Sequence, residues 1–310
     1  MSDDLAWVVP VVLTVVGSST PLLLAAMGEL VTEKSGVLNL GVEGMMLIGA
    51  VTAFAATLAS GSHAIGIVAG AAGGAAAALV FAVLTLTLLS NQVATGLALT
   101  IFGIGLSALV GRDLVGVALA PLPKLAIPGL SDIPVLGALL FGHDILVYLS
   151  FVMVALVAFF LYRTRLGLVL RAVGDQHDAA HAIGYPVIAI RYLATLFGGA
   201  MSGLAGAYMS LAYTPMWAEN MTAGRGWIAL ALVVFATWRP VRVLVGAYLF
   251  GGITILQLNV QGMGIAIPSQ MMSMLPYLAT IVVLVAISRD RAKIRLNAPA
   301  CIGKPFHPAG

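Results

Sequence analysis

The sequence predicts an all-α, polytopic integral membrane protein with about nine transmembrane helices. Apolar residues make up 61% of the chain and charged residues 9%, and the mean hydropathy is +1.06, well above the range of water-soluble globular proteins. Positions 44–111 hold no Asp, Glu, Lys or Arg, an interval long enough for three spanning helices of about 20 residues each. We therefore expect a single transmembrane domain over residues 1–310.

The expected spans follow the uncharged stretches in chain order. They cover residues 5–28, 40–60, 64–89, 92–111, 145–162, 188–212, 226–238, 243–259 and 273–288. The seventh is short, at about 13 residues, and is either a half-helix or a span extended by its flanks. Eight and ten spans are therefore the alternatives to nine. The chain starts with Asp3 and Asp4 instead of basic residues, which indicates a retained first helix and not a signal peptide.

Arginine and lysine gather in three places, and these clusters predict the orientation. They lie in the loop 163–171, the turn 239–242 and the tail 289–295. The positive-inside rule assigns all three to the cytoplasm. We expect a cytoplasmic loop at 163–187, a cytoplasmic tail at 289–310 and, with nine spans, an amino end outside. The net charge of +3 is too small to indicate nucleic acid.

The segment 29–50 interrupts the apolar pattern. Glu29, Glu33 and Glu43 fall within it, together with several glycines and Asn39. Polar, non-helical backbone within a membrane requires water or protein to satisfy it. Two interpretations remain open: a cytoplasmic loop between two spans, or a broken second helix in which Asn39 and Glu43 line a passage, as discontinuous helices do in transporters.

The loop 163–187 contains a short capped helix. Asp175 is the predicted N-cap, Asp178 places a carboxylate in the first turn, and Gly184 suits the carboxyl-terminal cap. A helix of about two turns is marginal alone in water, so it must pack on its own membrane domain or on a partner. Either way, its position suits a mechanical coupling element.

Uncharged polar residues mark two span ends. They are Asn91, Gln92 and Thr95 at the start of the fourth span and Asn259 at the end of the eighth. Amides and hydroxyls suit a polar, uncharged cargo because they form hydrogen bonds without the cost of an unpaired charge. They serve hydrogen bonding between helices equally well.

A fourth polar group lies at the outer mouth of the seventh span: Glu219, Asn220, Arg225 and Trp227. An arginine and a tryptophan at a membrane edge are ordinary interface residues. The alternative is that this group receives the substrate or the protein that delivers it.

Motifs for catalysis and metal binding are missing from the sequence. It contains no G-x-x-x-x-G-K-[ST] phosphate loop and no H-E-x-x-H. His177 and His181 share a helix face, but no third ligand is close in sequence. We expect a non-catalytic subunit with no metal and no cofactor, so any ATP hydrolysis must occur on another chain.

Three stretches resemble a known family. They are SGVLNLGVEGMMLIGA at 35–50, LRAVGDQHDAAHAIGYPVIAIR at 170–191 and TAGRGWIALALVVFATWRP at 222–240. The first two are similar to permease subunits of bacterial ABC importers in the branched-chain amino acid, ribose and nucleoside group. The third is most similar to the nucleoside, or simple-sugar, branch. The resemblance runs from about residue 17 to residue 288.

The resemblance implies a multi-pass protein of the bacterial inner (plasma) membrane, with its carboxyl end in the cytoplasm. Its implied partners are a second, different permease subunit, two cytoplasmic ATPase subunits or domains, and a periplasmic or lipid-anchored solute-binding protein. The coupling helix of the family falls on Asp175–Ile183. The chain departs from the family at Gln176, His177 and His181, where Glu or Asn, Pro and a small or polar residue are usual, and this affects the surface that the ATPase must match.

Three functions follow as hypotheses. The first is an importer permease that moves a nucleoside or related small polar solute inward by alternating access. The second is an ion-coupled secondary transporter that uses Glu43 to carry a proton or to bind sodium. The third is a membrane scaffold without transport activity, which would tolerate changes across residues 175–184.

Overall fold

The computed structural model describes residues 3–125, 133, 136–262 and 297–307, with positions 271, 274, 275, 278, 279, 281, 282 and 285. Helices account for its regular structure, and three isolated bridges are the only β pairings among the described residues. The helices are α1 (Asp3–Lys34), α2 (Val42–Ser60), α3 (His63–Ala82), α4 (Gln92–Gly111), α5 (Leu136–Phe141), α6 (Ile145–Arg163), α7 (Arg165–Asp175), α8 (His177–Ala182), α9 (Val187–Tyr208), α10 (Arg225–Phe235) and α11 (Pro240–Gly262). Single π turns extend α3 over Val83–Thr87 and α9 over Met209–Tyr213, and a 3₁₀ turn follows α4 at Arg112–Leu114.

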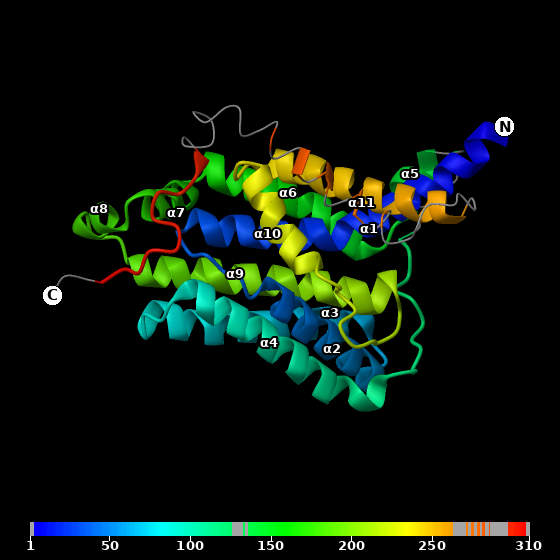
Figure 1. Cartoon of the computed structure of the whole chain (residues 1–310), viewed down its shortest axis with the longest axis horizontal. Helices are drawn as coiled ribbons and strands as arrows, with labels where there is room; N and C mark the ends of the chain where they lie inside the picture. The colour runs from blue at the N-terminus through cyan, green and yellow to red at the C-terminus, as the bar shows by residue number, and fades with distance from the viewer. Residues whose placement is uncertain are drawn as a thin grey trace.

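Seven of the described helices are long and apolar enough to cross a membrane. These are α1, α2, α3, α4, α6, α9 and α11, which confirms the all-α, multi-pass class. The predicted total of nine is not confirmed, because most of the expected span 273–288 lies outside the described residues. In Figure 1, α8 and the carboxyl end lie at the left and the amino end at the right, so the long helices run between an α8 end and an opposite end.

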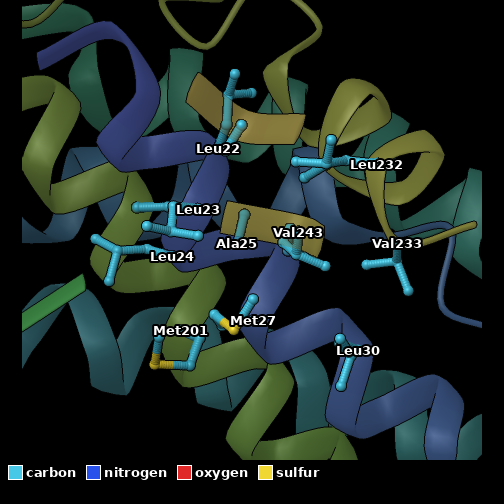
Figure 2. Packing of buried hydrophobic residues seen from close by; sticks show 14 of the residues in the cluster. Leu22, Leu23, Leu24, Ala25, Met27, Leu30, Met201, Leu232, Val233 and Val243 are labelled. Atoms are coloured by element: carbon cyan, nitrogen blue, oxygen red, sulfur yellow. The ribbon is translucent and has the colours of Figure 1, made fainter. Parts of the chain in front are cut away.

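The first helix is the centre of the bundle. From Leu22 to Leu30 its apolar side chains are buried on every side, which is typical of a helix enclosed by protein. Figure 2 shows these side chains meeting Met201 of α9, Leu232 of α10 and Val243 of α11. The helix continues to Lys34, six residues beyond the predicted end of the first span, so the expected boundary at residue 28 was wrong.

Helices α2, α3 and α9 cross at glycines with their backbones in direct contact. A Cβ atom on Gly49 of α2 would overlap the backbone of Gly203 in α9, and one on Gly203 would overlap Gly70 of α3. Small residues at crossing points allow this approach in membrane proteins. Glycines of α3 and α9 therefore serve close helix packing in this bundle.

Helix α10 is a half-helix. Its 11 residues rise about 16 Å, roughly half of the 30 Å hydrocarbon core of a bilayer. The loop 214–224 covers the remaining distance from the end of α9, so loop and helix together return the chain to the α8 end (Figure 1). Of the two predictions for the short seventh span, the half-helix agrees with this geometry.

Candidate functional site

The α1–α2 junction, residues 35–41, is a non-helical segment inside the bundle. Asn39 is fully buried, and side chains satisfy the backbone around it. The Leu38 N–H donates to the Gln92 side-chain oxygen at 2.8 Å, and the Asn39 N–H donates to the Glu29 carboxylate at 3.3 Å. The Asn39 amide oxygen accepts the N–H two residues ahead at 2.9 Å. This burial agrees with a broken second helix, one of the two interpretations that the sequence left open.

Glu43, in the first turn of α2, holds the beginning of α10. Its Oε1 accepts hydrogen bonds from the Thr222 hydroxyl at 2.5 Å and from the Gly224 N–H at 2.8 Å. Its Oε2 accepts the Gly226 N–H at 2.6 Å. The side chain is buried, and three donors around a carboxylate supply the partners that a buried charge requires. Glu43 therefore caps α10 from another helix.

This contact lies close to the middle of the bundle. Helix α9 with its π turn covers Val187–Tyr213, so its midpoint is near residue 200. Gly49 of α2 meets Gly203 of α9, and the two helices run in the same direction. Glu43 is six residues before Gly49, or about 9 Å nearer the α8 end, which places it within about one helical turn of the midpoint. Two helices, α2 and α10, thus begin near the centre of the membrane domain.

The residues predicted at the outer mouth separate into two groups. Glu219 and Asn220 are exposed in the loop before α10. Arg225 is half-buried: its guanidinium donates to the Thr222 backbone oxygen at 3.2 Å and lies 5.5 Å from the centre of the Tyr213 ring. The loop is thus exposed at its middle and anchored at its end.

Trp227 belongs to an apolar pocket beside α10. Its side chain is 39% exposed. The pocket has a free volume of about 200 Å³ and is lined by Gly224, Trp227, Ile228, Ala231, Leu232, Phe235 and Phe250. The pocket adjoins the Glu43 contact, because Gly224 both lines it and donates its N–H to Glu43.

The uncharged amides do not form one cluster. Asn91 caps α4 by accepting the Ala94 N–H at 3.0 Å. Gln92 is buried: its oxygen serves the α1–α2 junction, but its amide nitrogen has no partner within the described structure. The Thr95 hydroxyl lies 2.8 Å from a neighbouring serine hydroxyl. Asn259 is exposed near the far end of α11, where its amide donates to the backbone of its own helix.

The predicted short helix in the loop 163–187 is present, with one boundary shifted. Helix α8 covers His177–Ala182, and Gln176 is its N-cap, so the prediction of Asp175 as N-cap was wrong. Asp175 instead ends α7. The reason is that α7 runs to the edge of α8, leaving a single residue between them. At the other end Gly184 has a φ of 93°, and the N–H groups of residues 184 and 185 donate to the carbonyls of residues 181 and 180. This is the Schellman cap that a glycine favours.

The α8 residues face two directions. Asp175, Gln176, Asp178, His181 and Gly184 are exposed, as a surface for a partner requires. His177 is buried instead, with Nδ1 accepting a hydrogen bond from the Arg191 guanidinium at 3.0 Å. Burial lowers the pKa of His177 below its ordinary value and the cation of Arg191 lowers it further, whereas Asp178 acts in the opposite sense. His177 is therefore an internal contact of the coupling loop.

Three residues of this architecture were not among the predicted site residues. Arg191 at the start of α9 and Thr222 before α10 make the contacts described above, and Trp238 donates its indole N–H to the buried Glu33 carboxylate at 2.5 Å. An arginine at the first turn of a span was the one available signal, because a cation there needs a partner.

Comparison with known proteins gives a consistent result. The family described as "Branched-chain amino acid transport system / permease component" matches residues 11–284. The putative glucose ABC transporter permease protein TsgC13 of Haloferax volcanii is 42% identical over 94% of this chain and 95% of its own length. The guanosine ABC transporter permease protein NupQ of Bacillus subtilis is 32% identical over 93% of each chain.

A further relative is the nucleoside ABC transporter permease protein NupC of Lactococcus lactis subsp. cremoris, 32% identical over 86% of this chain and 88% of its own. No solved structure matches the chain. The family match covers the α1–α2 junction, the coupling loop and α10, the three stretches that carried the resemblance in the sequence. The chain therefore belongs to the family of permease components of branched-chain amino acid transport systems.

Proposed function

We propose that this chain is the non-catalytic permease subunit of an ABC importer that moves a nucleoside or a related neutral, polar solute into the cell. The observation that carries the proposal is the pair of helices that begin in the middle of the bundle, joined by Glu43 to the loop before α10. Discontinuous helices at mid-membrane depth mark the solute path in transporters. Membership of this permease family favours an ABC permease over an ion-coupled carrier.

The state of Glu43 also supports this choice. An ion-coupled carrier needs a carboxylate that gains and loses a proton or a sodium ion during transport. Both oxygens of Glu43 accept hydrogen bonds from the protein. We assign Glu43, with Asn39, to the framework of the path: they keep the broken backbone satisfied while neighbouring residues meet the cargo.

Neutral hydrogen-bonding groups and an aromatic surface are the proposed cargo contacts. The Gln92 amide nitrogen is buried without a protein partner, and it lies beside the α1–α2 junction. Trp227 presents an aromatic face at the mouth of the α10 pocket, where a base or a sugar ring can stack. Asn91 and Thr95 at the start of α4, and Asn259 near the opposite end of α11, are proposed contacts at the two ends of the path.

The cargo has two candidates. Two relatives are named for guanosine or nucleosides, and a third, with the highest identity of the three, is named for glucose. A nucleoside and a sugar share a hydroxylated ring without charge. We propose a nucleoside first and a sugar second.

The proposed orientation places the α8 end in the cytoplasm of a cell bounded by this plasma membrane. Arg163, Arg165 and Arg171 lie there, as the positive-inside rule requires, and the carboxyl end lies beside them. The exposed face of α8 then meets one of two ATPase subunits or domains. A second, different permease completes the pore, and a periplasmic or lipid-anchored binding protein delivers solute near Glu219 and Asn220.

The test is uptake by the complete transporter in vesicles, with radiolabelled guanosine, adenosine or glucose outside and ATP supplied to the cytoplasmic face. ATP-dependent accumulation of a nucleoside, reduced by unlabelled nucleoside and not by glucose, is the expected result. Accumulation of glucose alone keeps the permease and transfers the cargo to the sugar class. Uptake that follows a proton or sodium gradient without ATP contradicts the proposal.

A further inference from the structure

The carboxyl-terminal segment Asn297–His307 is bound to the junctions of the bundle. The Cys301 N–H donates to the Gly174 oxygen at 2.9 Å, next to α8. The Gly303 N–H donates to the Gly36 oxygen at 3.1 Å, in the α1–α2 junction. At the start of the segment the Lys34 ammonium donates to the Asn297 oxygen at 2.6 Å. The segment therefore contacts both the coupling loop and the broken helix.

Arg191 joins the same three parts through one side chain. Its Nε donates to the Ser35 backbone oxygen at 3.2 Å, its Nη1 to the Lys304 backbone oxygen at 3.2 Å, and its Nη2 to His177 Nδ1 at 3.0 Å. The residue is 1% exposed. A guanidinium has five donors in a rigid fork and can reach three acceptors at once, which a lysine cannot reproduce.

Phe306 fills the space beneath α8. Its ring meets the rings of His177 and His181 edge-on, at centroid distances of 5.2 and 5.3 Å, and it packs with Val173 and Ala180. A helix of six residues cannot hold itself together in water, and only His177 and Ala180 of α8 are buried. Phe306 therefore supplies a large part of the apolar surface on which α8 rests.

We propose that the segment Asn297–His307 locks α8 to the α1–α2 junction, and that Arg191 and Phe306 are the positioning residues of this lock. A displacement of α8 by the ATPase then moves Ser35–Gly36, and through them the segment that leads to Glu43. The inference rests on the proposed function and adds a transmission path to it. The family match ends at residue 284, before this segment begins.

Cys301 makes the lock measurable. It is the only cysteine in the chain, it is 8% exposed, and its thiol donates to the Asp175 oxygen at 3.4 Å. A maleimide reaches the thiol only when the segment leaves its place. The rate of labelling of Cys301 in the assembled transporter therefore reports the lock independently of transport.

The experiment compares Phe306→Ala with His307→Ala, which removes an exposed ring from the adjacent position. In Phe306→Ala we expect maleimide labelling of Cys301 to become at least tenfold faster and solute transported per ATP hydrolysed to fall at least fivefold, with the ATPase still co-purifying. In His307→Ala both quantities stay at the level of the unmodified protein. Fast labelling with unchanged coupling in Phe306→Ala overturns the proposal.

A second measurement needs no substitution and covers the case in which Phe306→Ala does not fold. In the unmodified transporter, Cys301 is labelled with and without a trapped ATP analogue. A lock that moves together with α8 keeps the thiol protected in both states. Labelling in the ATP-bound state at the rate of the unfolded chain contradicts the lock. If the unmodified transporter shows no ATP-driven uptake, the proposed function fails. The protection of Cys301 from the maleimide then still tests the lock by itself.

Discussion

Replacing Glu43 by glutamine isolates the role of its second carboxylate oxygen. The amide keeps one oxygen, which best occupies the place of Oε1, where Thr222 and Gly224 both donate. Its NH₂ group then faces the Gly226 N–H. In the unmodified protein this N–H donates to Oε2 at 2.6 Å. Glu43→Gln thus removes one hydrogen bond, takes the charge from the other two and leaves a buried donor without an acceptor.

The expected cost follows from that single lost acceptor. A hydrogen bond to a charged group contributes about 1.5–3 kcal/mol, and a buried unsatisfied donor costs about 1–3 kcal/mol. The amide is also easier to bury than the carboxylate, which offsets part of the loss. We expect the start of α10 to be less stable against local opening by about 1–3 kcal/mol. Because 1.4 kcal/mol is a factor of ten, opening becomes roughly 5- to 150-fold more frequent.

Hydrogen–deuterium exchange of the transporter in lipid nanodiscs measures this opening. Peptides covering residues 222–228 should exchange faster in Glu43→Gln, and peptides from α6 should not change. Thr222→Val is the matched control: it removes one donor from the same carboxylate and leaves both glycine contacts, so its effect should be smaller. If exchange at 222–228 changes by less than twofold while uptake is lost, Glu43 acts through its charge during transport, and the reasoning about a clamp is refuted.

Three further predictions test other parts of the structure. Gly203→Ala should reduce the yield of folded protein on gel filtration, because the new Cβ atom would overlap backbone atoms of α3 and overpacking costs about 1–3 kcal/mol. Gly105→Ala is the control: its Cβ atom would face open space, so the yield should not change. The contribution of His177 to the free energy of unfolding should be constant above about pH 6.5 and decrease below it, because the folded state disfavours the protonated ring. His177→Gln should remove this pH dependence from thermal unfolding measured between about pH 5 and 8. Trp238→Phe should lower the unfolding temperature, since it takes the N–H donor from the buried Glu33 carboxylate at a cost of about 1–3 kcal/mol, and unchanged unfolding would contradict this role.

The outer helices of the bundle were the most predictable from the sequence. Spans expected at 64–89, 92–111 and 145–162 correspond to α3 with its π turn, α4 and α6. Hydropathy was sufficient there because an uncharged run between polar flanks needs no distant partner. These helices also keep much of their surface outside the protein interior.

The end of α1 was not predictable by the same means. Glu29, Glu33 and Lys34 indicated an exit from the membrane, yet the helix continues through all three, and each is buried. Their partners lie elsewhere in the chain: the Trp238 indole for Glu33 and the Asn297 oxygen for Lys34. A charge count along one segment cannot include groups supplied more than 200 positions away.

The candidate site was predictable in position but not in role. The sequence singled out Glu43 and the break around it, and left a loop and a buried break as equal alternatives. The structure joins Glu43 to Thr222 and Gly224, about 180 positions later. Those residues carry no charge and stood out only as part of a family stretch, so nothing local indicated that the carboxylate belongs to another helix.

The meeting of two helix beginnings at Glu43 also determines the electric field in the centre of the bundle. The first turn of a helix carries a partial positive charge of about half a unit, and α2 and α10 both start here. Together they contribute about +1, which the single carboxylate of Glu43 cancels. Within this contact the two helix dipoles and the carboxylate therefore offset one another, and the contact itself favours neither a cation nor an anion. Discrimination at this contact rests on shape and hydrogen bonding.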